Sequence, residues 1–217
     1  MMALLRLVPV PRFGASPHAC RFQHFSPAFG HTPPRRNAHA HIMTAVLPSI
    51  ACLGIIGRNN NPLHTSIFPS YDACTKTSHP LRTPLQFSLL LSSTLDVFAQ
   101  RAARNAVSGD VGLLHAVDDR LAAYGFETNT GVRMVVVVDM RGRRADAGAP
   151  QGLRDAELKP VFRAMQTAYV ALLQNPFFDP HQHAPLGGSG GKSIASRRFK
   201  DEMTRIGETW VPGMTSL

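Results

Sequence analysis

The stretch Leu121-Ala-Ala-Tyr-Gly-Phe-Glu-Thr-Asn-Thr-Gly-Val-Arg-Met-Val-Val-Val-Val-Asp139 decides the fold class. Leu121 to Thr128 has the composition of a β-strand, and Val132 to Asp139 has the valine content of a strand at the centre of a sheet. Asn129-Thr-Gly131 predicts a tight connection between them, because glycine adopts positive φ without steric cost. Val111 to Ala116, joined to this stretch by the turn-forming pair Asp118-Asp119, completes a predicted three-stranded antiparallel meander.

Two further strands and one helix are predicted upstream of the meander. Ile50 to Ile56 is a short apolar run that ends at a glycine- and asparagine-rich turn, and Leu63 to Phe68 follows as a return strand. Pro69 to Pro84 is polar and interrupted by proline, which predicts a loop. An amphipathic helix follows, because apolar residues recur at spacings of three and four: Phe87, Leu90, Leu91, Leu95, Phe98 and Ala102.

Two helices are predicted downstream, after a charged, glycine-rich loop at Arg141 to Gly152. The strongest helical pattern in the chain ends at Asn175-Pro176 and carries Val161, Phe162, Met165, Ala168, Tyr169, Leu172 and Leu173 on one face. The last helix carries Phe199, Met203, Ile206 and Trp210 on one stripe. The predicted fold class is therefore α+β, with element order β-β-α-β-β-β-α-α and helices covering a five-stranded antiparallel sheet.

The N-terminal region differs in composition from the rest. Residues 1–42 contain five arginines, six prolines, five histidines and no acidic residue. Prolines at this density break helices and strands, so we expect a disordered or mis-annotated extension over residues 1–43 and a folded domain over residues 44–217. The alternative is that residues 1–42 are a presequence and that the chain is a mitochondrially imported soluble protein of unknown chemistry.

Charge and cysteine content exclude several classes of protein. The formal net charge of +9 comes largely from the N-terminal arginines, and the remainder carries only +4, so a nucleic-acid partner is not expected. The three cysteines, Cys20, Cys52 and Cys74, form no C-x-x-C pair and cannot close a disulfide framework. No apolar run reaches the roughly 18–20 residues that a membrane span requires. A soluble intracellular protein is expected.

Candidate catalytic motifs fail on spacing. The run Gly187 to Ser193 resembles a phosphate-binding loop around Lys192, but Leu186 occupies the position that requires glycine. His181 and His183 lack a third ligand nearby for a metal, and no nucleophile has an activating neighbour. The basic clusters Arg141 to Arg144 and Arg197 to Lys200 are interpreted as solvated surface, with contact to an acidic membrane or partner as the alternative. We therefore expect no catalytic residue, no metal and no cofactor.

Several short sequence motifs, in this order, resemble those of the sedlin family of trafficking protein particle (TRAPP) subunits. They are Asn61-Pro-Leu63, Ser93-Thr-Leu-Asp-Val97, Tyr124-Gly-Phe-Glu-Thr-Asn129 with the valine-rich strand after it, Asn175-Pro-Phe-Phe178 and Ser196-Arg-Arg-Phe199. The resemblance covers Val46 to Ile206. It departs from the family in the proline-rich loop, in Gln100, Arg101 and Arg104 where acidic residues are usual, and in the extra glycine run 187–191.

The resemblance implies a longin-like (SNARE-like) fold, with one helix on one face of the sheet and two on the other. It implies a non-catalytic subunit of a vesicle tethering complex that acts between endoplasmic reticulum and Golgi and within the Golgi. The implied partners are the small longin-like and Bet-family core subunits and the large peripheral subunits, with a Rab GTPase contacted indirectly. The implied location is cytoplasmic and peripheral at these membranes.

The resemblance also implies a partner-binding role for Leu95 and Asp96. Leu95 lies on the predicted apolar stripe, and Asp96 is about 100° further around the helix, at the edge of that stripe. Two alternatives need no partner. In the first, Ser93 is the N-cap of a helix and Asp96, three residues later, completes a capping box with it. In the second, Asp96 is an ordinary solvated surface residue.

Overall fold

A computed structural model describes residues 46–72, 75–104, 112–144, 152–183, 185 and 191–217. The predicted extension over residues 1–43, with its presequence alternative, lies outside the described residues, as does most of the glycine run. Within the described ranges, every helix is too short or too polar to cross a lipid bilayer.

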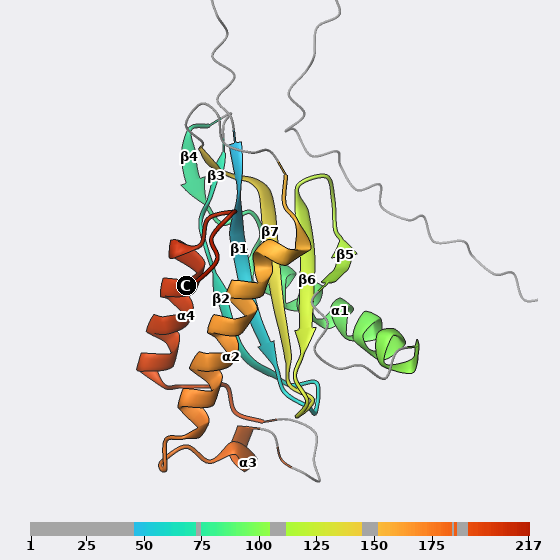
Figure 1. The fold of residues 1–217 in the computed structure, drawn as a ribbon, viewed down its shortest axis with the longest axis vertical. Helices are drawn as coiled ribbons and strands as arrows, with labels where there is room; N and C mark the ends of the chain where they lie inside the picture. The colour runs from blue at the N-terminus through green and yellow to red at the C-terminus, as the bar shows by residue number, and fades with distance from the viewer. Residues whose placement is uncertain (1–45, 73–74, 105–111, 145–151, 184, 186–190) are drawn as a thin grey trace, which may run out of the picture. The chain divides into compact units, whose positions relative to one another are not determined.

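A five-stranded antiparallel sheet forms the centre of the domain (Figure 1). Its spatial order is β2-β1-β7-β6-β5, so the first and last strands of the chain meet in the middle of the sheet. The strands are β1 (Val46–Ile56), β2 (Pro62–Ile67), β5 (Gly112–Ala116), β6 (Leu121–Glu127) and β7 (Arg133–Arg144). The predicted sheet and its three-stranded meander are confirmed.

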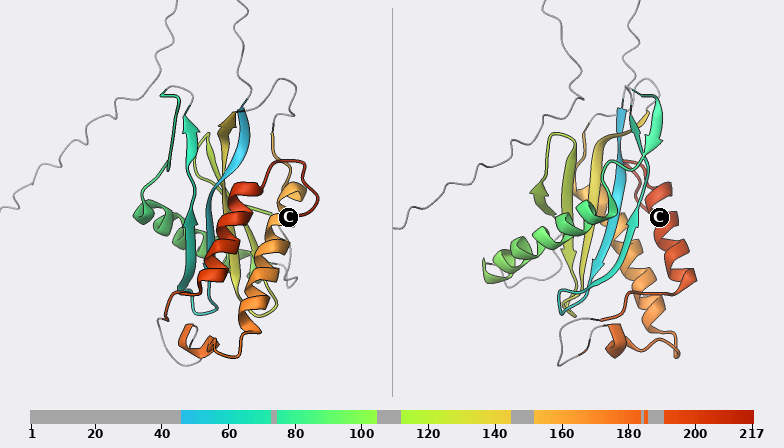
Figure 2. Two further views of the ribbon diagram at one scale, coloured as in Figure 1. Left: turned by 90° about the vertical axis from the view of Figure 1, so that its left-hand side faces the viewer. Right: turned by 180° about the vertical axis from the view of Figure 1, so that it is seen from behind.

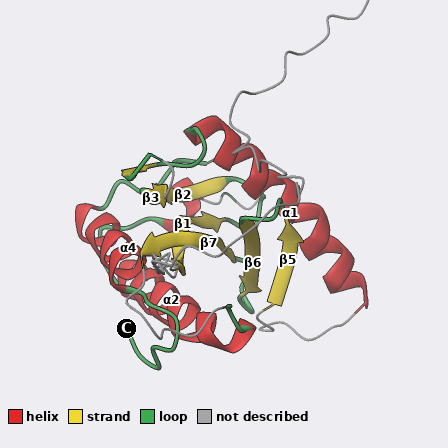
Figure 3. Cartoon of the chain, turned by 90° about the horizontal axis from the view of Figure 1, so that it is seen from above, coloured by secondary structure: helices red, strands yellow, loops and turns green. Residues whose placement is uncertain are grey.

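The valine run of β7 is buried on both faces because the helices cover both sides of the sheet. Met134, Val136 and Val138 join the core under α2 (Lys159–Leu173) and α4 (Arg197–Thr209). Val135 and Val137 point the other way, into the core under α1 (Pro84–Arg104). The view from above shows α1 on one side of the sheet and the α2–α4 pair on the other (Figure 3). The helix arrangement that the resemblance implied is confirmed.

A glycine allows α1 to approach the sheet closely. Gly54 lies in the middle of β1, and a Cβ atom there would come within 2.6 Å of a methyl carbon of Leu91 on α1. Such a distance is a steric clash, so the Leu91 side chain would have to move aside for a larger residue at this position.

The structure corrects two predictions about connecting segments and adds two short helices. The segment predicted as a loop, Pro69 to Pro84, contains a small antiparallel hairpin of β3 (Ser70–Asp72) and β4 (Thr77–His79). β7 continues to Arg144 through the first part of the predicted charged loop, because Leu47 pairs with Arg143 across the sheet. Two short helices, η1 (Asp155–Leu158) and α3 (Pro180–His183), flank α2. The extension of β7 depends on pairing with β1, which is far away in the sequence, rather than on local periodicity.

A buried histidine makes the stability of this domain depend on pH. His64 on β2 packs edge-on against the Phe199 ring at 5.3 Å, with its Nε2 atom 2.7 Å from Ser66 Oγ. Burial, together with the positive charge of Lys200, lowers the pKa of the imidazole from 6.5 to about 4. The folded state therefore resists protonation that the unfolded state accepts, so His64 lowers the stability progressively as the pH falls from about 6.5 to 4.

We expect His64→Leu to reduce this acid sensitivity. Urea unfolding at pH 7 and pH 5 measures it: the wild-type chain should lose more unfolding free energy between the two pH values than the variant does. Carboxylates contribute equally to the pH dependence of stability in both chains, so the difference between the two losses of unfolding free energy comes from His64. Equal losses in the two chains would contradict the burial of a neutral imidazole.

Candidate partner-binding surface

Helix α1 begins at a reciprocal capping arrangement. The Gln86 backbone N–H donates to Thr83 Oγ1 at 3.3 Å, and the Thr83 N–H donates to Gln86 Oε1 at 2.9 Å. Pro84 follows the cap directly, where its missing N–H costs nothing. The helix thus starts before the apolar pattern at Phe87, which was the first signal used to predict it.

The inner face of α1 is buried against the sheet. Phe87, Leu91 and Phe98 are buried in the core cluster on that side, and Thr94 is buried with them because its hydroxyl donates to the Leu91 carbonyl at 2.6 Å. Leu95 is half-buried and packs against the same cluster. Leu95 therefore forms the edge of the buried face.

The outer face of α1 carries large apolar side chains in solvent. Leu85 is 69% exposed and Leu89 is 62% exposed. Asp96 is exposed on the same face, because steps of four and seven residues bring a helix back to nearly the same direction. We call Leu85, Leu89 and Asp96 the outer α1 face. Asp96 thus lies further from the core than its predicted position at the edge of the apolar stripe.

Asp96 has no structural task within the described part of the chain. No hydrogen bond or ion pair there involves its carboxylate. The capping-box alternative is wrong, because α1 begins at Pro84 and the Ser93 hydroxyl donates to the Leu90 carbonyl at 2.8 Å inside the helix. Solvated surface and a partner contact are the remaining interpretations.

Leu85 and Leu89 were missed by sequence reasoning, although a signal was present. Thr83-Pro-Leu-Gln86 is a helix-start pattern, and reading it would have placed the start a turn earlier and put both leucines on one face. Two neighbouring exposed leucines beside a free carboxylate are a surface that a protein partner can bury, with the acid setting orientation.

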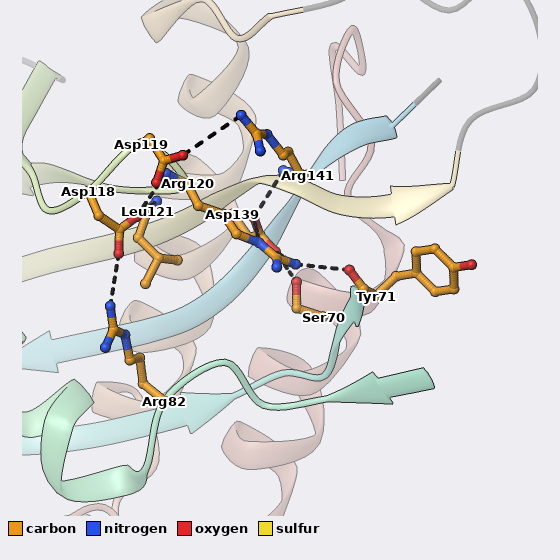
Figure 4. A network of polar contacts seen from close by, with 9 residues as sticks. All are labelled: Ser70, Tyr71, Arg82, Asp118, Asp119, Arg120, Leu121, Asp139 and Arg141. Carbon is orange, nitrogen blue, oxygen red and sulfur yellow. Dashed lines mark hydrogen bonds and ion pairs between the residues drawn. The ribbon is translucent and has the colours of Figure 1, made fainter. Parts of the chain in front are cut away.

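A second cluster that sequence reasoning missed surrounds the buried carboxylate of Asp139 (Figure 4). Arg120 donates to it through Nε and Nη2, both at 2.9 Å, and the Arg141 N–H donates at 2.9 Å. The Ser70 hydroxyl also donates to it, and Arg120 reaches the Tyr71 carbonyl at 2.9 Å. This cluster ties the β3–β4 hairpin to β6 and β7.

Hydrogen bonds in and beside this cluster shift the pKa values of Arg120 and Asp118. The hydrogen bond to Asp139 raises the pKa of Arg120 above its ordinary value. Burial alone would raise the pKa of Asp118, but hydrogen bonds from the Leu121 and Arg120 N–H groups and from Arg82 lower it overall. Asp139 is closed to solvent and fully paired, so it serves the fold and has no access to a substrate.

The remaining candidates from the sequence have structural explanations. His183 stacks on Phe178 at 4.5 Å, and its Nδ1 lies 2.6 Å from the Lys192 carbonyl. Lys192 itself donates through Nζ to Gln182 Oε1 at 3.2 Å. The described residues contain no group of three or more histidine, cysteine, aspartate or glutamate side chains placed to hold a metal.

One basic cluster is part of the fold rather than a solvated loop. Arg143 donates to the Glu208 carbonyl at 3.0 Å and the Trp210 carbonyl at 3.3 Å, at the carboxyl end of α4. Arg144 lies over the Tyr71 ring at 5.3 Å. Both therefore join β7 to neighbouring elements. Arg197, Arg198 and Lys200 in the other cluster are exposed, as predicted.

A comparison with known protein families decides the identification. The family model described as Sedlin matches residues 55–209, from the end of β1 to the end of α4. The chain belongs to the sedlin family.

Individual sedlin relatives agree along most of their length. The trafficking protein particle complex subunit 2-like protein of Dictyostelium discoideum is 26% identical over 163 residues, which cover 74% of this chain and 97% of the relative. The proteins of the same name from Xenopus tropicalis and Mus musculus are each 28% identical over 161 residues, which cover 71% of this chain and 94% of the relative.

The residues of the sedlin-like sequence motifs differ in their structural roles. Asn61 is buried at the β1–β2 turn, where its Nδ2 donates to the His183 carbonyl at 2.5 Å. Asn175 closes α2: its Oδ1 accepts the Phe177 N–H at 3.1 Å, and its carbonyl accepts the Phe178 N–H at 3.0 Å. In the motif on α1, by contrast, Asp96 is exposed and has no such structural role.

Proposed function

We propose that this sedlin-family chain is a non-catalytic subunit of a TRAPP-type vesicle tethering complex. The relatives are named as subunits of, or proteins like subunits of, a trafficking protein particle complex. The proposed role is in transport from the endoplasmic reticulum to the Golgi and within the Golgi, as part of an assembly that promotes nucleotide exchange on a Rab GTPase.

The outer α1 face is the observation that carries this proposal. A subunit without an active site needs a surface that a neighbour buries, and Leu85 and Leu89 present apolar area that the domain itself leaves in water. Asp96 supplies a charge on the same face that fixes orientation. The one fully buried carboxylate of the described residues, Asp139, is committed to the fold, which supports a role without catalysis.

The proposed partners are other subunits of the complex: the small longin-like and Bet-family core subunits and the large peripheral ones. The Rab GTPase is contacted through the assembly rather than by this chain. The chain works in the cytoplasm, at the surfaces of endoplasmic reticulum and Golgi membranes, and binds them peripherally.

Substitution of Asp96 tests the surface. Asp96→Tyr adds bulk on the outer α1 face, and Asp96→Asn removes only the charge. We expect Asp96→Tyr to lower the recovery of TRAPP subunits with the tagged full chain by at least about tenfold, equivalent to about 1.4 kcal/mol of binding, and Asp96→Asn to lower it less. Both variants should unfold within about 0.5 kcal/mol of wild type, because the side chain is exposed.

Asp201→Tyr is the matched control. Asp201 is an exposed acid on α4, on the opposite side of the sheet, so the same chemical change there should leave TRAPP subunit recovery at the wild-type level. Wild-type recovery with Asp96→Tyr would refute the assigned surface. Failure of the wild-type chain to recover any TRAPP subunit would refute the proposed function itself.

A further inference from the structure

The helices α2 and α4 lie side by side on the face of the sheet opposite α1 (Figure 2, left). A groove lies between them. Its volume is about 650 Å³, within the range of about 300–1,000 Å³ that is usual for ligand sites. The groove exists because α2 presents small side chains to α4 here: Thr167, Ala168 and Ala171. Buried Phe199 of α4 lies at its base.

The same helix pair already holds a piece of polypeptide further along. Thr215, Ser216 and Leu217 line a second hollow of about 190 Å³ with residues of α2 and α4. Thr167 and Glu202 line both hollows, so the two adjoin. The Leu217 side chain packs against the core there. Non-helical chain with an aliphatic side chain therefore packs beside these helices, and a larger hollow adjoins it.

The charges around the open groove favour an acidic occupant. Glu202 is the acidic residue among the groove-lining side chains, and it is committed to Arg205 through contacts of 2.6 and 3.0 Å. Arg198 lines the groove at the start of α4, and its positive charge acts on Glu202 one turn further along; it makes no hydrogen bond or close ion pair with the described residues. The positive end of the α4 helix dipole lies at the same place, which adds to the field of Arg198.

We propose that the α2–α4 groove binds an extended acidic peptide segment of a partner protein. A carboxylate of that segment pairs with the Arg198 guanidinium, and an apolar side chain of it fills the space between Ala171 and Phe199. This site does not rest on the proposed function, because the outer α1 face lies on the other side of the sheet. It gives the domain a second surface, so one chain can join two partners.

Selection from a displayed library of random heptapeptides on the purified full chain tests this site. The selection is done at about 150 mM salt, which screens non-specific attraction between charges. We expect the enriched peptides to share an aspartate or glutamate and an apolar residue at a fixed spacing. Binding of the best synthetic peptide should weaken at least about tenfold in Arg198→Glu and in Ala171→Phe, where the phenyl ring fills the groove.

Arg197→Glu is the matched control for charge. Arg197 is the preceding residue of α4, is exposed, and lies outside the groove lining, so this variant has the same net charge as Arg198→Glu and should keep wild-type affinity. Selection on Arg198→Glu should instead enrich basic peptides. The proposal is overturned if no peptide is enriched, if the enriched peptides lack an acidic residue, or if Arg197→Glu weakens binding as much as Arg198→Glu does.

Ala171→Phe keeps the test decisive should Arg198→Glu unfold. Ala171 is exposed, so a larger side chain there is accommodated by the open space without disturbing the core. Val170→Phe, on the same helix but outside the groove lining, should bind the peptide at wild-type affinity. Equal affinity of Ala171→Phe and wild type would place the peptide elsewhere and overturn the proposal.

Discussion

Phe162→Ala is expected to destabilise the domain by about 3–5 kcal/mol. Phe162 is only 2% exposed, in the core between α2 and the sheet, and its ring centroid lies 5.9 Å from that of Phe126. Removing the ring loses its burial and leaves a cavity that close-packed neighbours fill only in part. Urea unfolding measures the loss, and the melting temperature should fall by roughly 6–20 °C.

Phe177→Ala is the matched control, because the same ring is removed from a side chain that is 93% exposed. Its unfolding free energy should stay within about 0.5 kcal/mol of wild type. A loss below about 1 kcal/mol for Phe162→Ala would mean that the inner face of α2 has been assigned incorrectly.

Asp139→Ala is expected to lower the free energy of unfolding by about 3 kcal/mol, near the lower end of the range for removing one partner of a buried ion pair. The substitution leaves the donors of Arg120, Arg141 and Ser70 without their acceptor. The cost stays near the lower end because the Arg120 side chain is 25% exposed and can turn partly to water. Hydrogen exchange should accelerate in the β3–β4 hairpin in particular, since Ser70 and Tyr71 lose their link to the sheet.

Two comparisons make the result specific to the buried pair. Asp119→Ala removes a neighbouring carboxylate that is 83% exposed and 3.9 Å from Arg141, and it should change the stability by less than about 0.5 kcal/mol. The double variant Asp139→Ala with Arg120→Leu should lose about 0.5–3 kcal/mol less than the two single losses added together, because neither partner is left alone. Strict additivity would show that the two residues do not form a coupled pair.

The sheet could be predicted from the sequence because its pattern is local. Burial of β7 on both faces requires apolar side chains at every position from Met134 to Val138, and the run of valines meets this requirement. Asn175-Pro176 likewise marks the end of α2, since proline restricts the residue before it and the Asn175 side chain bonds the following turn.

The candidate surface was predicted only in part. Asp96 came from the resemblance, and neither the structure nor the comparisons assign it a partner. Phe87, Thr94 and Phe98 are buried, so the middle of the inner face of α1 lies along these residues and Leu95 lies at its edge. Asp96 therefore lies on the outer face. Leu85 and Leu89 became candidates only when their exposure was known, because a leucine near a helix start has the same sequence signature whether it is buried or not.

The sequence by itself determined the five strands of the main sheet, the three long helices and their order, because hydrophobic periodicity and turn residues act over a few neighbouring positions. The resemblance to the sedlin family came from short sequence motifs. Only the tertiary structure decided the β3–β4 hairpin, the buried Asp139–Arg120 pair and the α2–α4 groove. Each of these joins residues that are far apart in the chain, such as Ser70 with Asp139 or Thr167 with Arg198. The free energy of such contacts depends on distance and burial in three dimensions, and neither quantity is written in the local pattern of residues.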